Sequence, residues 1–379
     1  MRFEDTTVRR LLALGAVTCI AACGGGGGGG DDNDDGGDGG GPALERTAVV
    51  LTTDFTSSSL ATLPVDDPSS TTIDDQTLHG DSVARAFGRV VYVLNRFGAD
   101  NVQALDAADD YETLWQCSVG NGKNPHDIAK ATDDKAYVAL YGGGVAVVNL
   151  NPSPDCSDFV QQEIDLSSLA DDDGIPEADR MVLVDGMLYV SLQRLENFAP
   201  SDASVLAVID TASDTLAGSI PLSGTNPFAE TKGLPLDPAT GKILVATIGE
   251  FGATDGGIER VDPATGTAEG YFITEAELGG DINDFTIVSS TRGYAVVSDA
   301  DFNNSLVRFD PSTGTVQATL ATGAAYLPDV EYDASTDRIF LASQDFANPG
   351  IRIFAADDAE VTSAPIDTGL PPFNIDFVE

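Results

Sequence analysis

The chain has 379 residues, of which 42% are hydrophobic, so most of it can bury a core as one all-β domain or as two smaller units. Its 61 acidic residues against 19 basic ones give a formal net charge of −42. This charge repels phosphate backbones and anionic head groups, so nucleic acid is excluded as an expected partner. We interpret the acidic excess as a solubility feature of the whole surface.

The first 22 residues have the pattern of a secretory signal peptide. Arg2, Arg9 and Arg10 precede an apolar run, Leu11 to Ala22, that is too short to span a bilayer. The run leads into Ile20-Ala21-Ala22-Cys23, which resembles the lipobox of bacterial lipoproteins. The resemblance implies that Cys23 carries a lipid. An exported protein without a lipid, cleaved nearby, is the alternative.

A glycine- and aspartate-rich segment follows, from Gly24 to Gly41. Such a composition cannot bury apolar surface, so it predicts a flexible, self-repelling tether. By the lipoprotein resemblance, Gly24 after the cysteine favours the outer membrane, on either its periplasmic or its surface side. The expected organisation is a signal peptide at 1–22, a lipid-anchored linker at 23–45 and a folded domain at 46–379, with the lipid as the sole membrane contact.

One unit recurs every 45–54 residues in the rest of the chain, a period typical of propeller blades. The clearest copy begins at Asn124-Pro125-His126-Asp127-Ile128-Ala129 and continues, after a turn, through Ala136-Tyr137-Val138. Matching positions fall at Ser82, Asp127, Asp179, Gly233, Asp284, Asp329 and Asn374.

Each unit is expected to form four strands. In the sixth unit they are Phe285–Val288, Tyr294–Ser298, Leu306–Phe309 and Val316–Leu320. Asp310-Pro311-Ser312-Thr313-Gly314 turns between the last two, and related runs begin at Asp237 and Asp262. We assign these runs to turns and not to sites.

The two ends of the repeat array complement each other. The last copy stops after one strand, Ile375–Phe377, and the first copy, from Ala48 to Leu78, lacks that strand. Together they make one blade, which closes a ring without a free edge. The sequence therefore predicts an all-β, seven-bladed β-propeller of four-stranded blades, expected to be a monomer. A solenoid is the alternative, but it would not need complementary ends.

The repeat resembles the YVTN-repeat propellers, a bacterial group within the WD40-like set. Asn124-Pro125-His126-Asp127-Ile128, Val91-Tyr92-Val93, Ala136-Tyr137-Val138 and Leu188-Tyr189-Val190 carry the resemblance over roughly residues 46–379. It implies the fold, but propellers include scaffolds, lectins, lactonases and phytases, so it leaves the function open.

Few residues favour catalysis. Only His79 and His126 are histidines, and neither has a second histidine at ligand spacing, so zinc sites and His-based triads are poorly supported. We expect His126 to have a packing or hydrogen-bonding role. No Gly-x-Ser-x-Gly nucleophile turn and no phosphate-binding glycine loop is present.

Calcium is the cofactor that the acidic residues best support. Asp171-Asp172-Asp173-Gly174 with Glu177 resembles part of a calcium loop, although Leu169 occupies the position of its first ligand. Asp171, Asp173 and Glu177 are the candidate ligands, and a solvated acidic connector is the alternative.

Cys117 and Cys156 remain after export and lipidation, and an even pair in an oxidising compartment is compatible with a disulfide. They fall on or beside the predicted outer strands of adjacent blades, where contact is possible but not assured.

The repeat also predicts a candidate binding face. The start of the inner strand and the loop after the second strand lie at the same end of a blade, so the residues there share one face. The starts of the inner strands carry polar residues, with Gly233 as the exception: Ser82, Asp127, Asp179, Asp284, Asp329 and Asn374. The loops after the second strands each carry an aromatic residue: Phe55, Phe97, Tyr141, Phe198, Phe251, Phe302 and Phe346. An acidic centre inside an aromatic rim could hold a metal ion, a cation or a polar ligand. In the alternative, the acids bond neighbouring backbone and the rings fill the loops.

Three functions follow from these observations. The first is an envelope-anchored binding or scaffold module for an envelope protein, a glycan or a small ligand. The second is a cation-dependent propeller hydrolase, phytase-like or lactonase-like, using carboxylates at the channel mouth. The third, electron transfer by a quinoprotein, has less support because no Cys-x-x-Cys-His haem attachment motif exists.

Overall fold

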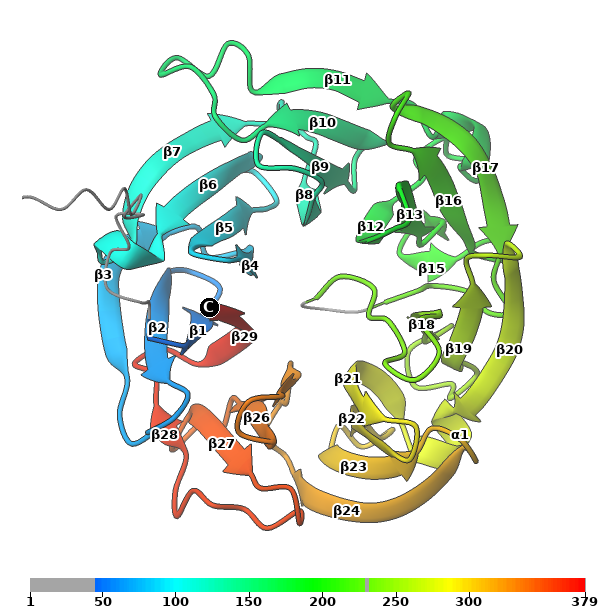
Figure 1. Cartoon of the computed structure of the whole chain (residues 1–379). Helices are drawn as coiled ribbons and strands as arrows, with labels where there is room; N and C mark the ends of the chain where they lie inside the picture. Colours follow the sequence, from blue (N-terminus) through cyan, green and yellow to red (C-terminus); the bar gives the residue numbers. More distant parts are fainter. Residues whose placement is uncertain (1–44, 229–231, 379) are drawn as a thin grey trace, which may run out of the picture. The chain divides into compact units, whose positions relative to one another are not determined.

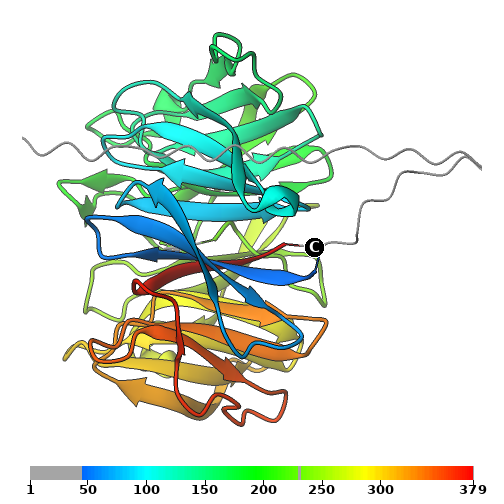
Figure 2. The same ribbon diagram turned by 90° about the vertical axis from the view of Figure 1, so that its left-hand side faces the viewer.

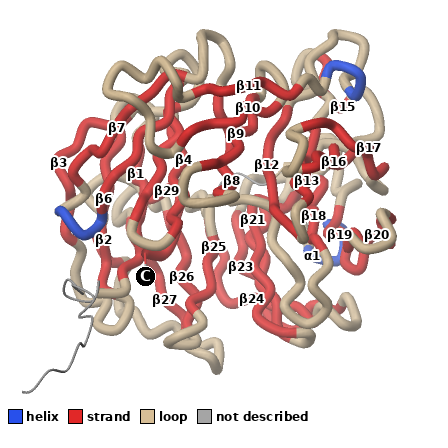
Figure 3. The backbone as a smooth tube through the Cα atoms, turned by 45° about the horizontal axis from the view of Figure 1, so that its top comes forward, coloured by secondary structure: helices blue, strands red, loops and turns tan. Residues whose placement is uncertain are grey.

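The computed structural model describes residues 45–228 and 232–378, which belong to one compact unit, Leu44–Glu379. Antiparallel sheets are arranged in a ring around a central axis (Figure 1), and helical structure is limited to single turns (Figure 3). The predictions for the signal peptide, for Cys23 and for residues 24–44 of the linker lie outside the described residues. Among the described residues, no helix is long and apolar enough to cross a membrane.

Seven blades make the ring, as the repeat predicts. From the inside outward, the first three are β29 (Pro372–Val378), β1 (Thr47–Thr53), β2 (Ser58–Pro64) and β3 (Thr72–Leu78); β4 (Ser82–Phe87), β5 (Val90–Asn95), β6 (Asn101–Asp106) and β7 (Glu112–Ser118); and β8 (Pro125–Lys130), β9 (Lys135–Leu140), β10 (Val145–Asn149) and β11 (Val160–Ile164).

The other four blades continue around the ring. They are β12 (Ala178–Val184), β13 (Met187–Leu192), β16 (Val205–Asp210) and β17 (Thr215–Pro221); β18 (Ile243–Thr247), β19 (Gly257–Asp262) and β20 (Thr267–Thr274); β21 (Asp281–Ser289), β22 (Arg292–Ser298), β23 (Asn304–Asp310) and β24 (Thr315–Gly323); and β25 (Val330–Asp333), β26 (Arg338–Ser343), β27 (Gly350–Phe354) and β28 (Ile366–Asp367). A hairpin of β14 (Leu195–Glu196) and β15 (Ala199–Pro200), two 3-10 turns, Ala107–Asp109 and Ser167–Leu169, and α1 (Glu275–Leu278) lie in the connections.

The fifth blade keeps the four-position plan with an irregular inner segment. Beside β18, the inner position is taken by residues 233–237, which make one isolated bridge, between Leu236 and Ile243. Pro235 and Pro238 flank that bridge, and proline has no N–H to donate to a ladder. The carbonyl of Pro235 still accepts a bond from the N–H of Leu244 at 2.9 Å.

The C-terminal strand closes the ring, as predicted. β29 pairs antiparallel with β1 and is the innermost strand of that blade, so the two ends of the array share one sheet (Figure 2). Phe373, Ile375 and Val378 of β29 are at most 4% exposed. Closure therefore buries apolar surface as well as pairing the edge of β1.

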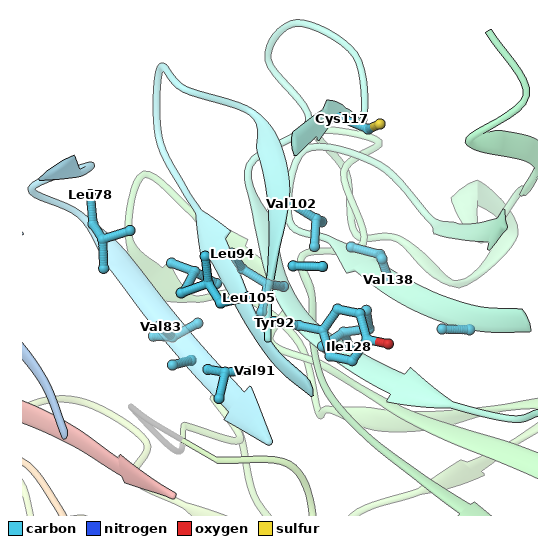
Figure 4. Packing of buried hydrophobic residues seen from close by; sticks show 14 of the residues in the cluster. Leu78, Val83, Val91, Tyr92, Leu94, Val102, Leu105, Cys117, Ile128 and Val138 are labelled. Atoms are coloured by element: carbon cyan, nitrogen blue, oxygen red, sulfur yellow. The ribbon is translucent and has the colours of Figure 1, made fainter. Parts of the chain in front are cut away.

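The core lies between neighbouring blades. Apolar side chains of β4, β5 and β6 pack against those of β8 and β9, including Val83, Leu94, Leu105, Ile128 and Val138 (Figure 4). Each strand alternates its side chains between the two faces of its sheet, and both faces of a blade meet a neighbour, so strands such as β5 and β9 are buried almost throughout.

The tyrosine of the repeat connects adjacent blades. Tyr137 on β9 is fully buried, and its hydroxyl donates to Asp214 in the turn before β17 of the next blade, at 2.5 Å. Tyr294 on β22 makes the same kind of bond to Asp358, after β27, at 2.7 Å. Burial and the aspartate raise the pKa of both hydroxyls, which keeps them protonated as donors. A buried ring with a bonded hydroxyl explains why tyrosine recurs there.

The Asp-Pro runs form turns, as predicted. Gly266 and Gly314 have φ of 64° and 65°, a left-handed conformation that favours glycine. Their N–H groups donate to the carbonyls of Asp262 and Asp310 at 2.9 and 2.8 Å. The aspartate side chains also accept backbone bonds inside the turn.

Cys117 in β7 and Cys156 in the loop before β11 form a disulfide between the second and third blades, with their Cα atoms 5.6 Å apart. Cys117 is 1% exposed and lies in the apolar cluster shown in Figure 4.

Removing residues 371–379 is expected to lower the melting temperature by about 10 °C or more, because the edge of β1 and the apolar surface of two blades become exposed. Circular dichroism during heating measures this. A synthetic peptide of residues 371–379 is expected to restore part of the loss, because it binds the folded ring and not the unfolded chain. An unchanged melting temperature would contradict closure by the C-terminus.

Candidate functional site

Aromatic side chains form a rim on one face of the ring, which we call the aromatic face. Each of the seven blades carries one of them in the loop between its second and third strands, at Phe55, Phe97, Tyr141, Phe198, Phe251, Phe302 and Phe346. The six phenylalanines are 64–103% exposed. Tyr141 is partly buried and stacks on His126, with ring centroids 4.5 Å apart. Six exposed rings on one face leave apolar surface available for binding.

The polar residues at the inner-strand starts lie inside the protein and do not line an open channel mouth. Their exposed fractions are at most 2%, for Ser82, Asp127, Asp179, Asp284, Asp329 and Asn374. This corrects the sequence-based picture of an acidic centre that faces solvent. The physical reason is that the inner strands have backbone N–H groups that need acceptors, and four of these side chains supply them. Ser82 donates to His79 and Asn95, and Asp179 bonds His126 and Gln193.

Four of these side chains bond the next blade, and we call these bonds the inter-blade bonds. Asp127, Asp284 and Asp329 each accept from the backbone N–H of the following inner strand, and Asn374 does so with its Oδ1. The donors are Met181 at 2.8 Å, Val330 at 2.8 Å, Ile375 at 2.6 Å and Ala84 at 2.6 Å, respectively. Each bond joins residues on two blades, so the set ties much of the ring together.

A cluster of charged side chains, partly or fully buried, lies next to these bonds. Lys232 Nζ lies 3.4 Å from Asp284 and 2.9 Å from Glu331. Burial, together with the Asp284 and Glu331 carboxylates, raises the pKa of Asp329 well above its usual value. Burial raises the pKa of Glu331 to about 7, although Lys232 opposes that shift. The cluster therefore retains protons at a pH at which exposed carboxyls are ionised.

Gly233 is the exception in the repeat because the axis is crowded there. A Cβ on Gly233 would lie 2.6 Å from a guanidinium nitrogen of Arg85 and 2.7 Å from the carbonyl oxygen of Met181. Arg85 comes from the second blade and bonds Asp127 of the third at 3.1 Å. The side chain of Arg85 thus reaches across from the second blade to the backbone of the fifth.

His126 takes part in a buried polar network. Its Nδ1 lies 2.9 Å from Asp179, which also accepts from Gln193 at 2.8 Å. Burial lowers the pKa of His126. Burial alone would raise the pKa of Asp179, but Arg180 and His126 hold it below its usual value. The ring of His79 makes local contacts, since its Nδ1 lies 3.1 Å from the carbonyl oxygen and 3.2 Å from the nitrogen of Asp81.

Each of the calcium-loop candidates accepts a hydrogen bond from the protein. Asp173 accepts from the N–H of Ile175 at 2.7 Å, Asp171 accepts from Ser201, and Glu177 is buried and accepts from the N–H of Leu195 at 3.2 Å. Burial raises the pKa of Glu177 to about 7. Within 45–228 and 232–378, no group of three or more His, Cys, Asp or Glu side chains is placed to hold a metal ion.

A cavity of about 790 Å³ opens among the fifth, sixth and seventh blades on the aromatic face. Three rim rings bound it, one from each of these blades: Phe251, Phe302 and Phe346. Phe228 and Tyr326 add two further rings, and Phe228 meets Phe251 edge to face with centroids 5.9 Å apart. Its volume is within the range of small-molecule sites, and its wall is mainly apolar with a few polar groups, as such sites usually are.

Acidic and amide side chains make up the polar part of the wall. Asp281 and Asn283 come from the start of β21, Asn304 comes from β23, and Asp299 and Asp345 come from the rim loops. Asp281 is 7% exposed, and its Oδ2 accepts from the N–H of Gly252 at 2.5 Å. Its Oδ1 is buried and has no hydrogen-bond partner in the part of the chain that the structure describes.

Sequence reasoning missed most of this wall. The rim rings were found because their loops repeat, but Asp281, Asn283 and Tyr326 stand outside the repeated positions. Asp281 lies three residues before Asp284, so an extra acid beside a repeat position was the available signal.

No protein-family model matches the chain, and no curated protein matches its sequence. Several solved structures are similar in fold. A proposed 6-phosphogluconolactonase of Bacteroides fragilis has a TM-score of 0.59 at 15% identity, over 90% of this chain and all of that one. The dihydro-heme d1 dehydrogenase NirN has a TM-score of 0.54 at 17% identity, and the match covers 88% of this chain and 75% of that one. AztD of Citrobacter koseri has a TM-score of 0.53 at 12% identity, and the match covers 88% of this chain and 98% of that one. At these identities the likeness shows the fold alone.

Variants of Asp329 test the inter-blade bonds. Asp329→Ala is expected to lower stability by about 1–3 kcal/mol, because it leaves the buried N–H of Ile375 without an acceptor. Asp329→Asn keeps an oxygen for that N–H and, like the protonated carboxyl, places no negative charge beside Asp284 and Glu331, so it is expected to cost less than about 1 kcal/mol.

Thermal and urea unfolding of both variants measure this difference, with Asp301→Ala in an exposed loop as the control. If the alanine and asparagine variants were equally stable, the bond to Ile375 would not hold the blades together.

Proposed function

We propose that this chain is a lipid-anchored binding protein of the bacterial cell envelope, and that it takes its ligand on the aromatic face. The anchor is supported by the signal-like N-terminus and by the lipobox-like sequence ending at Cys23. The Gly and Asp linker would then give the folded ring reach away from the membrane surface.

The cavity among the fifth, sixth and seventh blades is the observation that carries the binding part of the proposal. Exposed phenylalanines are costly in water unless they serve an interaction, and three of them bound this one cavity. The cavity is built on loops held by rigid sheets, which is a common arrangement for binding sites. Asp284 and Asp329 each use one oxygen to accept a backbone N–H inside the ring, and both side chains are at most 1% exposed, so they are not the ligand site of this proposal.

Cys23→Ser is expected to release the protein from membranes, because a lipid on that residue is the proposed anchor. Fractionation of cells that express the full chain measures this, with labelling by a fatty-acid analogue. Cys19→Ser is the matched control, because Cys19 lies in the segment that export would remove. Retention of the Cys23→Ser protein with the membrane would contradict the anchor.

Filling the cavity tests the binding site. Ala324 is exposed and lines the cavity, so Ala324→Trp is expected to occupy the space without disturbing the core. Ala212→Trp is the matched control, because Ala212 lies in an exposed turn between third and fourth strands, at the opposite end of its blade.

Ligand-observed NMR with a library of neutral, cationic and anionic small molecules is the measurement. We expect molecules that bind the wild type to bind Ala212→Trp equally and Ala324→Trp at least tenfold more weakly. Absence of any binder, or equal binding to both variants, would contradict the cavity as the site.

A further inference from the structure

The cavity combines aromatic faces with acceptor groups. Five of its residues are aromatic, and Asp281, Asp299 and Asp345 are acidic, whereas none of the described residues that line it is Lys, Arg or His. The negative potential of a chain with net charge −42 adds to this local charge. An anionic ligand would meet repulsion there without a compensating cation.

Several donors of the cavity are already engaged. The amide nitrogen of Asn283 donates to Ser298 Oγ at 2.9 Å and to Asn304 Oδ1 at 3.0 Å. Ser298 Oγ donates to Asn304 Oδ1 at 2.7 Å, and the amide nitrogen of Gln344 donates to the carbonyl of Pro372 at 3.0 Å. Asn283 and Ser298 therefore have no N–H or O–H left to donate to a ligand, and Gln344 keeps one N–H, whereas a sugar or an acid would call on several donors as well as acceptors.

Asp281 supplies the complementary observation. Its Oδ1 is a buried acceptor without a partner in the described ranges, and such an oxygen costs free energy until a donor reaches it. An N–H of a cationic group is the strongest donor for a carboxylate. The rings of Phe302 and Phe346, which are 82% and 103% exposed, can face the same cation.

We infer that the cavity binds a protonated amine carried on an apolar body. The ammonium group donates to Asp281 and lies against the phenylalanine faces, and the apolar body fills the rest of the cavity. This inference rests on the proposed function and specifies its ligand class.

Three probes that share an apolar body test it: 4-phenylbutylamine, 4-phenylbutanol and 4-phenylbutyrate, each titrated by calorimetry at pH 7 into the full chain. We expect the amine to bind at least tenfold more tightly than the alcohol, and the carboxylate to bind more weakly than either. Asp281→Asn retains an oxygen for the N–H of Gly252 and is expected to weaken the amine at least tenfold while changing the alcohol less than twofold.

Phe302→Leu provides a second variant that keeps an apolar side chain at an exposed position. It is expected to weaken the amine about two- to fivefold, because the π face is lost, and to leave the alcohol unchanged. Phe97→Leu, at the rim but outside the cavity, is the matched control and is expected to change neither.

The outcomes separate the two proposals. If the alcohol binds as tightly as the amine, and Ala324→Trp blocks both, the amine inference is wrong and the cavity remains a binding site. If the amine binds equally to the wild type and to Asp281→Asn, Asp281 does not recognise it and the inference is wrong. If none of the probes binds, the amine inference is wrong, and the library of neutral, cationic and anionic molecules decides whether the cavity is a site. If Ala324→Trp has no effect on the probes that bind, both proposals are wrong.

Discussion

The structure depends on how the inner strands of the ring satisfy their backbone. The N–H groups on the inner edge of each blade have no further strand to bond, and they are shielded from water. Asp127, Asp284, Asp329 and Asn374 accept those N–H groups across the gap to the next blade. A carboxylate at the start of an inner strand therefore has a structural reason to recur. The same bonds draw the inner strands together and leave little of these side chains exposed.

This arrangement separates polar and apolar groups in an unusual way. The acids of the inner strands are buried, whereas six phenylalanines of the rim are exposed. The cavity adjoins the fifth blade, whose inner segment is irregular. Phe228 lies in the connection that leads into that segment and contributes to the wall of the cavity. The aromatic face and the irregular fifth blade thus contribute to the same site.

Much of the architecture follows from sequence because it repeats. The positions around Ser82, Asp127 and Asp284 fix the number of blades, and the incomplete copies at the two ends predict that β29 joins β1. The turns at Asp262 and Asp310 follow from local proline and glycine chemistry. The rim was also predicted, since one aromatic residue stands at the same place in each blade.

The site itself could not be read in the same way. A repeated aspartate has the same letter whether it faces solvent or bonds a neighbouring strand, and only packing decides which. Gly233 departs visibly from the repeat, but its cause is Arg85, which reaches the axis from the second blade. Asp281 belongs to no repeat, and its importance arises from loops of three blades that enclose a cavity. These features depend on long-range contacts that periodicity does not encode.

Hydrogen exchange of single backbone amides tests the central claim most directly. The N–H groups of Met181, Val330, Ile375 and Ala84 bond side chains of the preceding blade. If those bonds hold the ring, the four amides exchange as slowly as the amides of β5 and β22, the second strands of their blades. Exchange of all of them then requires global unfolding. Fast exchange at the four amides, while β5 and β22 stay protected, would show that the blades are held together without them.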